Sequence, residues 1–138
     1  MQKFIDQHCF DLPAMKTRMQ MLDDLSNDAF EMITSLLNIA QNKNEHLSIF
    51  FKPLNNYEYY NVQLSKQKSK KRYLRIYAIK IYADCFVITG GAIKFHHLNK
   101  DRMHTQIEMT KMSLCGDYLK SVGVFDSISF CEFLNESI

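Results

Sequence analysis

The chain has 138 residues, of which 46% are hydrophobic and 23% are charged. This balance is ordinary for one folded domain spanning residues 1–138, and it excludes a low-complexity or intrinsically disordered chain. No apolar run approaches the ~20 residues that a membrane-spanning helix needs, so we expect a cytoplasmic protein without a membrane partner.

The formal net charge of +2 hides an uneven distribution along the chain. Residues 1–45 carry four basic and seven acidic side chains, residues 46–111 carry twelve and four, and residues 112–138 carry one and four. Such a partition favours a localised electropositive surface, which is the usual basis of phosphate recognition. The alternative is a solvated, lysine-rich loop.

The N-terminal third predicts two amphipathic helices. Lys3–Phe10 is compatible with an edge strand or an ordered arm. Asp11 can cap a helix whose first turn holds Pro13, and Ser26 or Asn27 then begins a second helix that ends near residues 41–44. Two consecutive amphipathic helices are expected to pack as a hairpin.

The middle of the chain predicts a small antiparallel sheet. Three runs are rich in Tyr, Val, Ile and Phe, the residues typical of strands: Tyr57–Leu64, Tyr73–Tyr82 and Cys85–Thr89. The basic link Ser65–Lys71 is predicted to be a mobile hairpin loop, because its charges repel one another. Gly90-Gly91 is predicted to end the last strand in a bulge or tight bend.

The C-terminal part predicts a third helix, opened by Asn99 or Asp101 and running to about Lys120. Asp126 can cap a short last helix, although a strand over Val124–Phe130 fits the pattern nearly as well. The predicted fold is therefore α+β, with an N-terminal helical hairpin packed on a small antiparallel sheet and a C-terminal helix.

The basic strand carries the most informative pattern. Strand side chains alternate, so Leu74, Ile76 and Ala78 share one face and Arg75 lies on the other, between Tyr73 and Tyr77. An Arg flanked by two Tyr suits an exposed functional face. It is also compatible with a structural cation–π arrangement.

The order of elements and three short segments resemble the RelE/HigB superfamily of toxin ribonucleases, including HigB-like and phage-derived toxins. The segments are Phe50-Phe51-Lys52-Pro53, Tyr73–Lys80 and Phe86–Lys94. The resemblance implies a RelE-like sheet with helices packed on one side. It also implies an mRNA endoribonuclease, usually acting on the ribosome, that is neutralised by a tightly bound antitoxin. Many members have Lys-Lys-Thr before the last helix, where this chain has Lys94-Phe95-His96-His97.

RNA cleavage by internal transfer needs a base, an acid and charge stabilisation of the phosphate, and His, Arg and Lys can supply these without a metal or cofactor. We therefore predict four catalytic residues: Arg75, Lys94, His96 and His97. His96 is preferred over His97 because it shares strand parity with Lys94. Further RNA-binding residues are predicted along the basic segment: Lys66, Lys68, Lys70, Lys71, Arg72, Tyr77 and Lys80.

Non-catalytic interpretations of the same residues stay open. The lysines can act as solvated steering charges whose contribution to affinity falls with salt, and either His can be an ordinary surface residue. The alternative function is a non-catalytic adaptor of the same fold, possibly phage-encoded, that binds nucleic acid or a protein partner.

Overall fold

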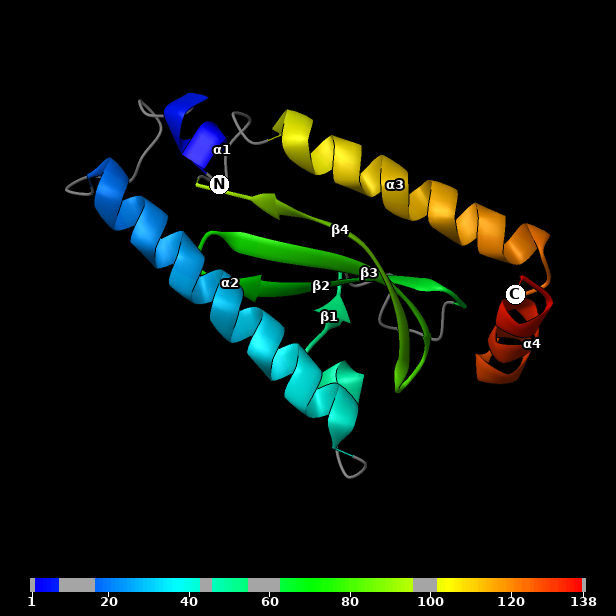
Figure 1. Cartoon of the computed structure of the whole chain (residues 1–138). Coiled ribbons are helices and arrows are strands. Elements are labelled where there is room, and N and C mark those ends of the chain that lie inside the picture. The colour runs from blue at the N-terminus through cyan, green and yellow to red at the C-terminus, as the bar shows by residue number, and fades with distance from the viewer. Residues whose placement is uncertain (1, 8–16, 43–45, 55–62, 96–101, 138) are drawn as a thin grey trace.

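The computed structural model describes residues 2–7, 17–42, 46–54, 63–95 and 102–137. Its strands form one antiparallel sheet in the order β1-β2-β3-β4, with α2 and α3 on opposite sides of it (Figure 1). The elements in chain order are α1 (Gln2–Gln7), α2 (Arg18–Gln41), the 3-10 helix η2 (Leu47–Ile49), β1 (Lys52–Pro53), β2 (Ser65–Lys71), β3 (Leu74–Tyr82), β4 (Cys85–Ile93), α3 (Arg102–Ser121) and α4 (Ser127–Ser137).

The two faces of the sheet are packed against different helices. On the α3 face, alternate residues of β3 join Met112 and Leu119 in one buried cluster: Tyr77, Ile79 and Ile81. On the α2 face, Leu74 and Ile93 pack against a second cluster that includes Met21 and Leu25 of α2. The α+β class is therefore confirmed, but the described helices cover both faces, whereas the resemblance implied helices on one side.

The N-terminal helical hairpin is wrong as predicted, because one uninterrupted helix, α2, runs through Ser26 and Asn27. Its start is set by Thr17, whose side chain accepts the backbone N–H of Gln20 while the Gln20 side chain accepts the backbone N–H of Thr17. The expected first helix falls partly on residues 8–16, outside the described residues. Instead of an edge strand, the short helix α1 occupies Gln2–Gln7 and packs against α2.

The predicted loop over Ser65–Lys71 is also wrong, because these residues form strand β2 in full register with β3. The segment alternates lysine with small polar residues, and that period of two matches a pleated strand. Ser65, Gln67 and Ser69 are buried on the α2 face, and Gln67 donates from Nε2 to Ser65 Oγ at 2.9 Å. The lysines project to the α3 face, so like-charge repulsion is confined to one side of the strand. The strand predicted over Tyr57–Leu64 lies outside the described residues except for Gln63 and Leu64, which form a turn.

Strand β4 passes through Gly90-Gly91 and continues to Ile93, so the glycines do not end it. The predicted irregularity is present: the register with β3 shifts between Tyr77 and Ala78, which face Gly90 and Ile88. The glycines permit close approaches. A Cβ on Gly91 would lie 2.8 Å from the backbone carbonyl oxygen of Arg75, and one on Gly90 would meet the carboxylate end of Glu108.

This difference predicts unequal costs for two neighbouring substitutions. Gly91→Ala forces a backbone shift and is expected to destabilise the fold by about 1–3 kcal/mol. Gly90→Ala displaces only the flexible end of the Glu108 side chain and should cost clearly less. Urea unfolding of both variants measures the difference, and equal free energies of unfolding would contradict the close packing of β4 on β3.

The C-terminal elements largely agree with the sequence. The third helix is confirmed as α3, which ends before Gly123, a glycine with φ of 82°. The short last helix is confirmed as α4, and the alternative strand is wrong. Asp126 accepts the Ser129 backbone N–H at 2.8 Å, and this bond and the Ser129 hydroxyl lower the pKa of the Asp126 carboxyl. None of the described helices combines the length and the apolar character needed to cross a membrane.

Candidate nucleic-acid interface

Basic side chains from separate parts of the chain meet on the α3 face of the sheet. Register with β3 pairs Lys66, Lys68 and Lys70 with Ile79, Tyr77 and Arg75, which all point to that face. Lys94 follows β4 directly, and its backbone N–H donates to the carbonyl oxygen of Tyr73 at 2.6 Å. We call this set of five cations the basic face: Lys66, Lys68, Lys70, Arg75 and Lys94.

Three cations of the basic face act on the ammonium of Lys68. Partial burial, together with repulsion from Arg75, Lys94 and Lys70, lowers the pKa of Lys68 from its ordinary value of 10.5. Arg75 and Lys94 therefore both lie close enough to Lys68 to act on its ammonium, although Arg75 itself is buried. A phosphate bound beside Lys68 would relieve the repulsion that its ammonium receives from the three neighbouring cations.

The prediction that Arg75 lies on an exposed face between Tyr73 and Tyr77 is wrong, because α3 covers much of this face. Arg75 is only 6% exposed, and its Nη1 donates to the backbone carbonyl oxygens of Arg72 and Leu74 at 2.8 and 2.9 Å. Arg75 therefore supports the β2–β3 turn as well as contributing charge. Tyr77 is 3% exposed and belongs to the core cluster under α3, where burial raises the pKa of its hydroxyl. Tyr77, which the sequence predicts to bind RNA, is thus a side chain of the core with almost no surface exposed to a ligand.

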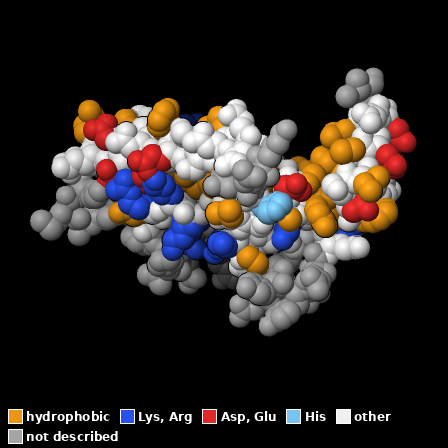
Figure 2. Space-filling view, turned by 90° about the horizontal axis from the view of Figure 1, so that it is seen from below, with side chains coloured by type: hydrophobic (Ala, Val, Ile, Leu, Met, Phe, Trp, Pro, Cys, Tyr) orange, Lys and Arg blue, Asp and Glu red, His pale blue; other side chains and the backbone are white. Residues whose placement is uncertain are grey.

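Lys71 and Arg72 turn the other way, toward α2. The Arg72 guanidinium donates from Nε and Nη2 to the two carboxylate oxygens of Asp28, both at 2.8 Å, and this pairing raises the pKa of Arg72. Lys71 forms an ion pair with Glu31. Basic and acidic side chains accordingly lie side by side at one end of the molecule (Figure 2). These two cations dock the hairpin onto α2, so their positive charge is neutralised within the fold.

The Arg72–Asp28 pair predicts an asymmetric mutational effect. Asp28 is 1% exposed, whereas the Arg72 side chain is 47% exposed. Arg72→Leu should therefore destabilise the fold strongly, because it leaves a buried carboxylate without its partner. Asp28→Leu should cost less, since the released guanidinium can be hydrated. The double variant should be more stable than Arg72→Leu alone, and thermal unfolding of all three tests this order.

The remaining predicted residues lie apart from the basic face or outside the described residues. Lys80 lies on the α2 face and lines a cavity of about 770 Å³. His96 and His97 fall in the range 96–101, which is not described. Phe95, immediately before them, is 8% exposed and meets the Tyr73 ring edge-on at 5.7 Å between centroids.

The arrangement can hold the backbone phosphates of a nucleic acid along β2, with Arg75 and Lys94 beside them. The alternation of Lys with Ser and Gln in Ser65–Lys71 is the sequence pattern that places Lys66, Lys68 and Lys70 on a different face from Lys71. Comparisons with protein-family models, with curated proteins and with solved structures found no match to this chain.

Proposed function

We propose that this chain binds RNA through the basic face and acts as an mRNA endoribonuclease, the toxin of a toxin–antitoxin pair. The observation that carries the proposal is that strand register places Lys68 and Lys70 of β2 and Arg75 of β3 on one face of the sheet. There Lys70, Arg75 and Lys94, from three separate segments of the chain, repel the partly buried Lys68 ammonium. Such a site favours a phosphodiester because each phosphate relieves repulsion that the fold otherwise retains.

The proposed reaction is attack of a ribose 2′-oxygen on the adjacent phosphorus, with departure of the 5′-oxygen. The 2′-hydroxyl gives its proton to a neutral imidazole, and the 5′-oxygen receives one from an acid. His96 or His97 would exchange these protons, since both follow Lys94 within three residues. Cations of the basic face would stabilise the charge that develops on the phosphate oxygens, without a metal or other cofactor.

The proposed partners follow from this activity. The substrate is mRNA, cut on the ribosome in the cytoplasm, and a cognate antitoxin neutralises the enzyme. The resemblance of Tyr73–Lys80 and Phe86–Lys94 to RelE/HigB toxins supports these partners.

Expression in a bacterial host tests the enzyme directly. Wild type should arrest growth and produce new mRNA 5′ ends. His96→Ala and His97→Ala are tested separately, and the variant that lacks the catalytic imidazole should lose cleavage and retain RNA binding. Lys94→Gln should weaken binding and cleavage together. If purified wild type leaves mRNA intact even when ribosomes are present, the enzyme proposal fails.

A non-catalytic RNA-binding adaptor is the second candidate, and one contact favours it. The Arg75 guanidinium is buried and donates to two backbone carbonyls, so it serves the hairpin in the absence of any ligand. The adaptor predicts that RNA binds with affinity that depends on the basic face, while growth and transcript integrity are unchanged on expression.

The lowered pKa of Lys68 predicts a pH dependence of RNA binding. Because phosphate prefers the charged ammonium, affinity should fall as pH rises through the pKa of Lys68, which lies below 10.5. Lys68→Arg stays protonated over this range, so its affinity should persist to higher pH. Fluorescence anisotropy with a short single-stranded RNA measures both curves, and identical pH profiles would contradict a contact between Lys68 and phosphate.

A further inference from the structure

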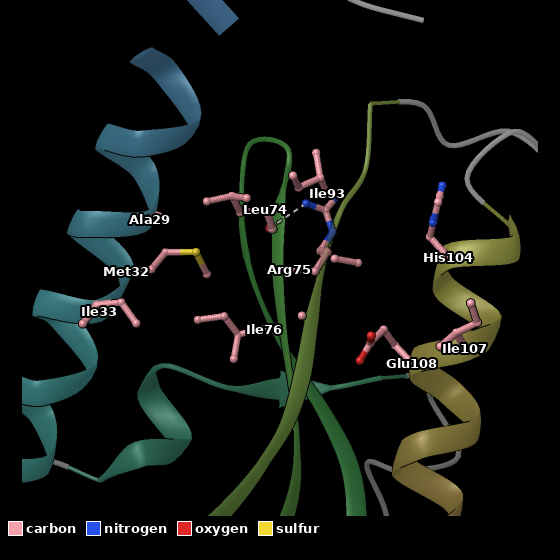
Figure 3. A pocket seen from close by; sticks show the side chains of 12 residues that line it. Ala29, Met32, Ile33, Leu74, Arg75, Ile76, Ile93, His104, Ile107 and Glu108 are labelled. Atoms are coloured by element: carbon pink, nitrogen blue, oxygen red, sulfur yellow. Dashed lines mark hydrogen bonds between the residues drawn. The ribbon is translucent and has the colours of Figure 1, made fainter. Parts of the chain in front are cut away.

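A second candidate site adjoins the basic face at Arg75, in a groove between α2 and α3. Its cavity of about 510 Å³ is lined by Met32 and Ile33 of α2, by residues of β3 and β4, and by Ile107 and Glu108 of α3. Figure 3 shows these side chains converging from both helices on the strand between them. We call this cavity the β4 groove.

The floor of the β4 groove is a sheet edge. Among the described residues, β4 pairs with β3 alone and is the last strand of the sheet. An edge strand presents backbone N–H and C=O groups to a further strand. Gly91 and Ala92 line the groove at this point, and the absence of a side chain on Gly91 and the single methyl group of Ala92 allow another backbone to come close.

One wall carries a buried carboxylate that lacks a full set of partners. The Glu108 side chain is 9% exposed, and its Oε1 accepts from Lys111 Nζ at 2.9 Å. Its Oε2 is the only buried side-chain oxygen or nitrogen of the described residues without a hydrogen-bond partner. The carboxylate points from α3 toward β4 (Figure 3). Leaving such an oxygen buried and unpaired is costly, so it indicates a missing hydrogen-bond donor, and Arg or Lys would supply a charge-assisted one.

The opposite wall is apolar and partly open to solvent. Ile33 on α2 is 50% exposed, and Ile107, next to Glu108 on the α3 wall, is 52% exposed. Side chains of an extended peptide alternate between two sides. A strand laid along β4 would therefore direct one set of side chains toward Met32 and Ile33 and the other set toward Glu108.

We propose that the β4 groove binds an extended segment of a protein partner as a fifth strand, with apolar residues facing α2 and an Arg or Lys paired with Glu108. Main-chain hydrogen bonds to β4 would supply affinity, and the two walls would supply specificity. The carboxylate disfavours RNA in this groove, because it would repel phosphate. The proposal does not depend on RNA cleavage. Arg75 lines the groove floor, but the proposed contacts are made by the β4 backbone, the apolar residues of α2 and Glu108.

The test uses the full chain and two fluorescent heptapeptides, one alternating Val with Arg and one alternating Val with Glu. The Arg peptide is expected to bind, and the Glu peptide should bind at least about tenfold more weakly, because it loses the charge-assisted hydrogen bond to Glu108. Glu108→Gln, nearly the same shape, should remove that preference. Ile33→Ser, at an exposed position on the apolar wall, removes the apolar contact without adding charge and should weaken the Arg peptide without altering the thermal midpoint.

Methylated peptides test the strand pairing without changing the protein. N-methylation of one alternate set of peptide residues should abolish binding, and methylation of the other set should be tolerated, because only one set faces β4. Hydrogen exchange of the free chain and of its complex then locates the contact, and new protection is expected at Gly91–Ile93.

Each contrary outcome overturns the proposal. Equal binding of the Arg and Glu peptides, or a preference that survives Glu108→Gln, would remove Glu108 from recognition. Tolerance of both methylated sets would exclude strand addition. A free chain that is already dimeric, with the β4 amides protected, would show that a second copy occupies this edge.

Discussion

Replacing Lys68 with Glu should lower RNA affinity about 100-fold at low salt, through loss of one phosphate contact and gain of one repulsion. The same substitution should leave the fold as stable as wild type or more stable. The reason is that Lys68 is repelled by Arg75, Lys94 and Lys70, and a carboxylate at this position would be attracted to all three. Filter binding with a short RNA and thermal unfolding measure the two effects.

Lys120→Glu is the matched control for Lys68→Glu, because it makes the same change in net charge on an exposed residue of the last turn of α3. It should change RNA affinity far less. Equal losses for the two variants would mean that RNA responds to net charge alone and that the basic face has no special role.

Leu25→Ala should destabilise the fold by about 2–5 kcal/mol, because Leu25 is fully buried between α2 and the sheet. Leu37→Ala on the same helix removes the same atoms from a side chain that is 54% exposed, and it should change stability by no more than about 0.5 kcal/mol. Urea unfolding monitored by circular dichroism measures both. Similar losses of unfolding free energy at the two positions would contradict the packing of α2 against the sheet.

The sequence predicted the helices and strands whose hydrophobic period was unambiguous. Strand β3, helix α3 and the Asp126 cap of α4 were found because alternation, helical spacing and a capping side chain each act locally. The break at Ser26 was predicted from a capping residue type alone. It is absent because Leu25 and Asp28 continue one buried stripe across it.

The candidate site was predicted less well, because its residues are sorted by the sheet rather than by their order in the chain. Lys70 and Lys71 are neighbours in sequence, yet strand alternation sends Lys70 to the basic face and Lys71 to Glu31 on α2. Arg72 is held by Asp28, 44 residues away, a pairing that only tertiary packing reveals. The sequence also gave no sign of the β4 groove, since Ile33 and Glu108 come from helices far apart in the chain.

A titration of the labelled protein with a short single-stranded RNA, followed by amide chemical shifts, tests most directly which surface holds the phosphates. The basic face predicts that the largest shifts occur at Lys66, Lys68, Lys70, Arg75 and Lys94. Shifts concentrated instead at Lys71, Arg72 and the adjoining turn of α2 would contradict it.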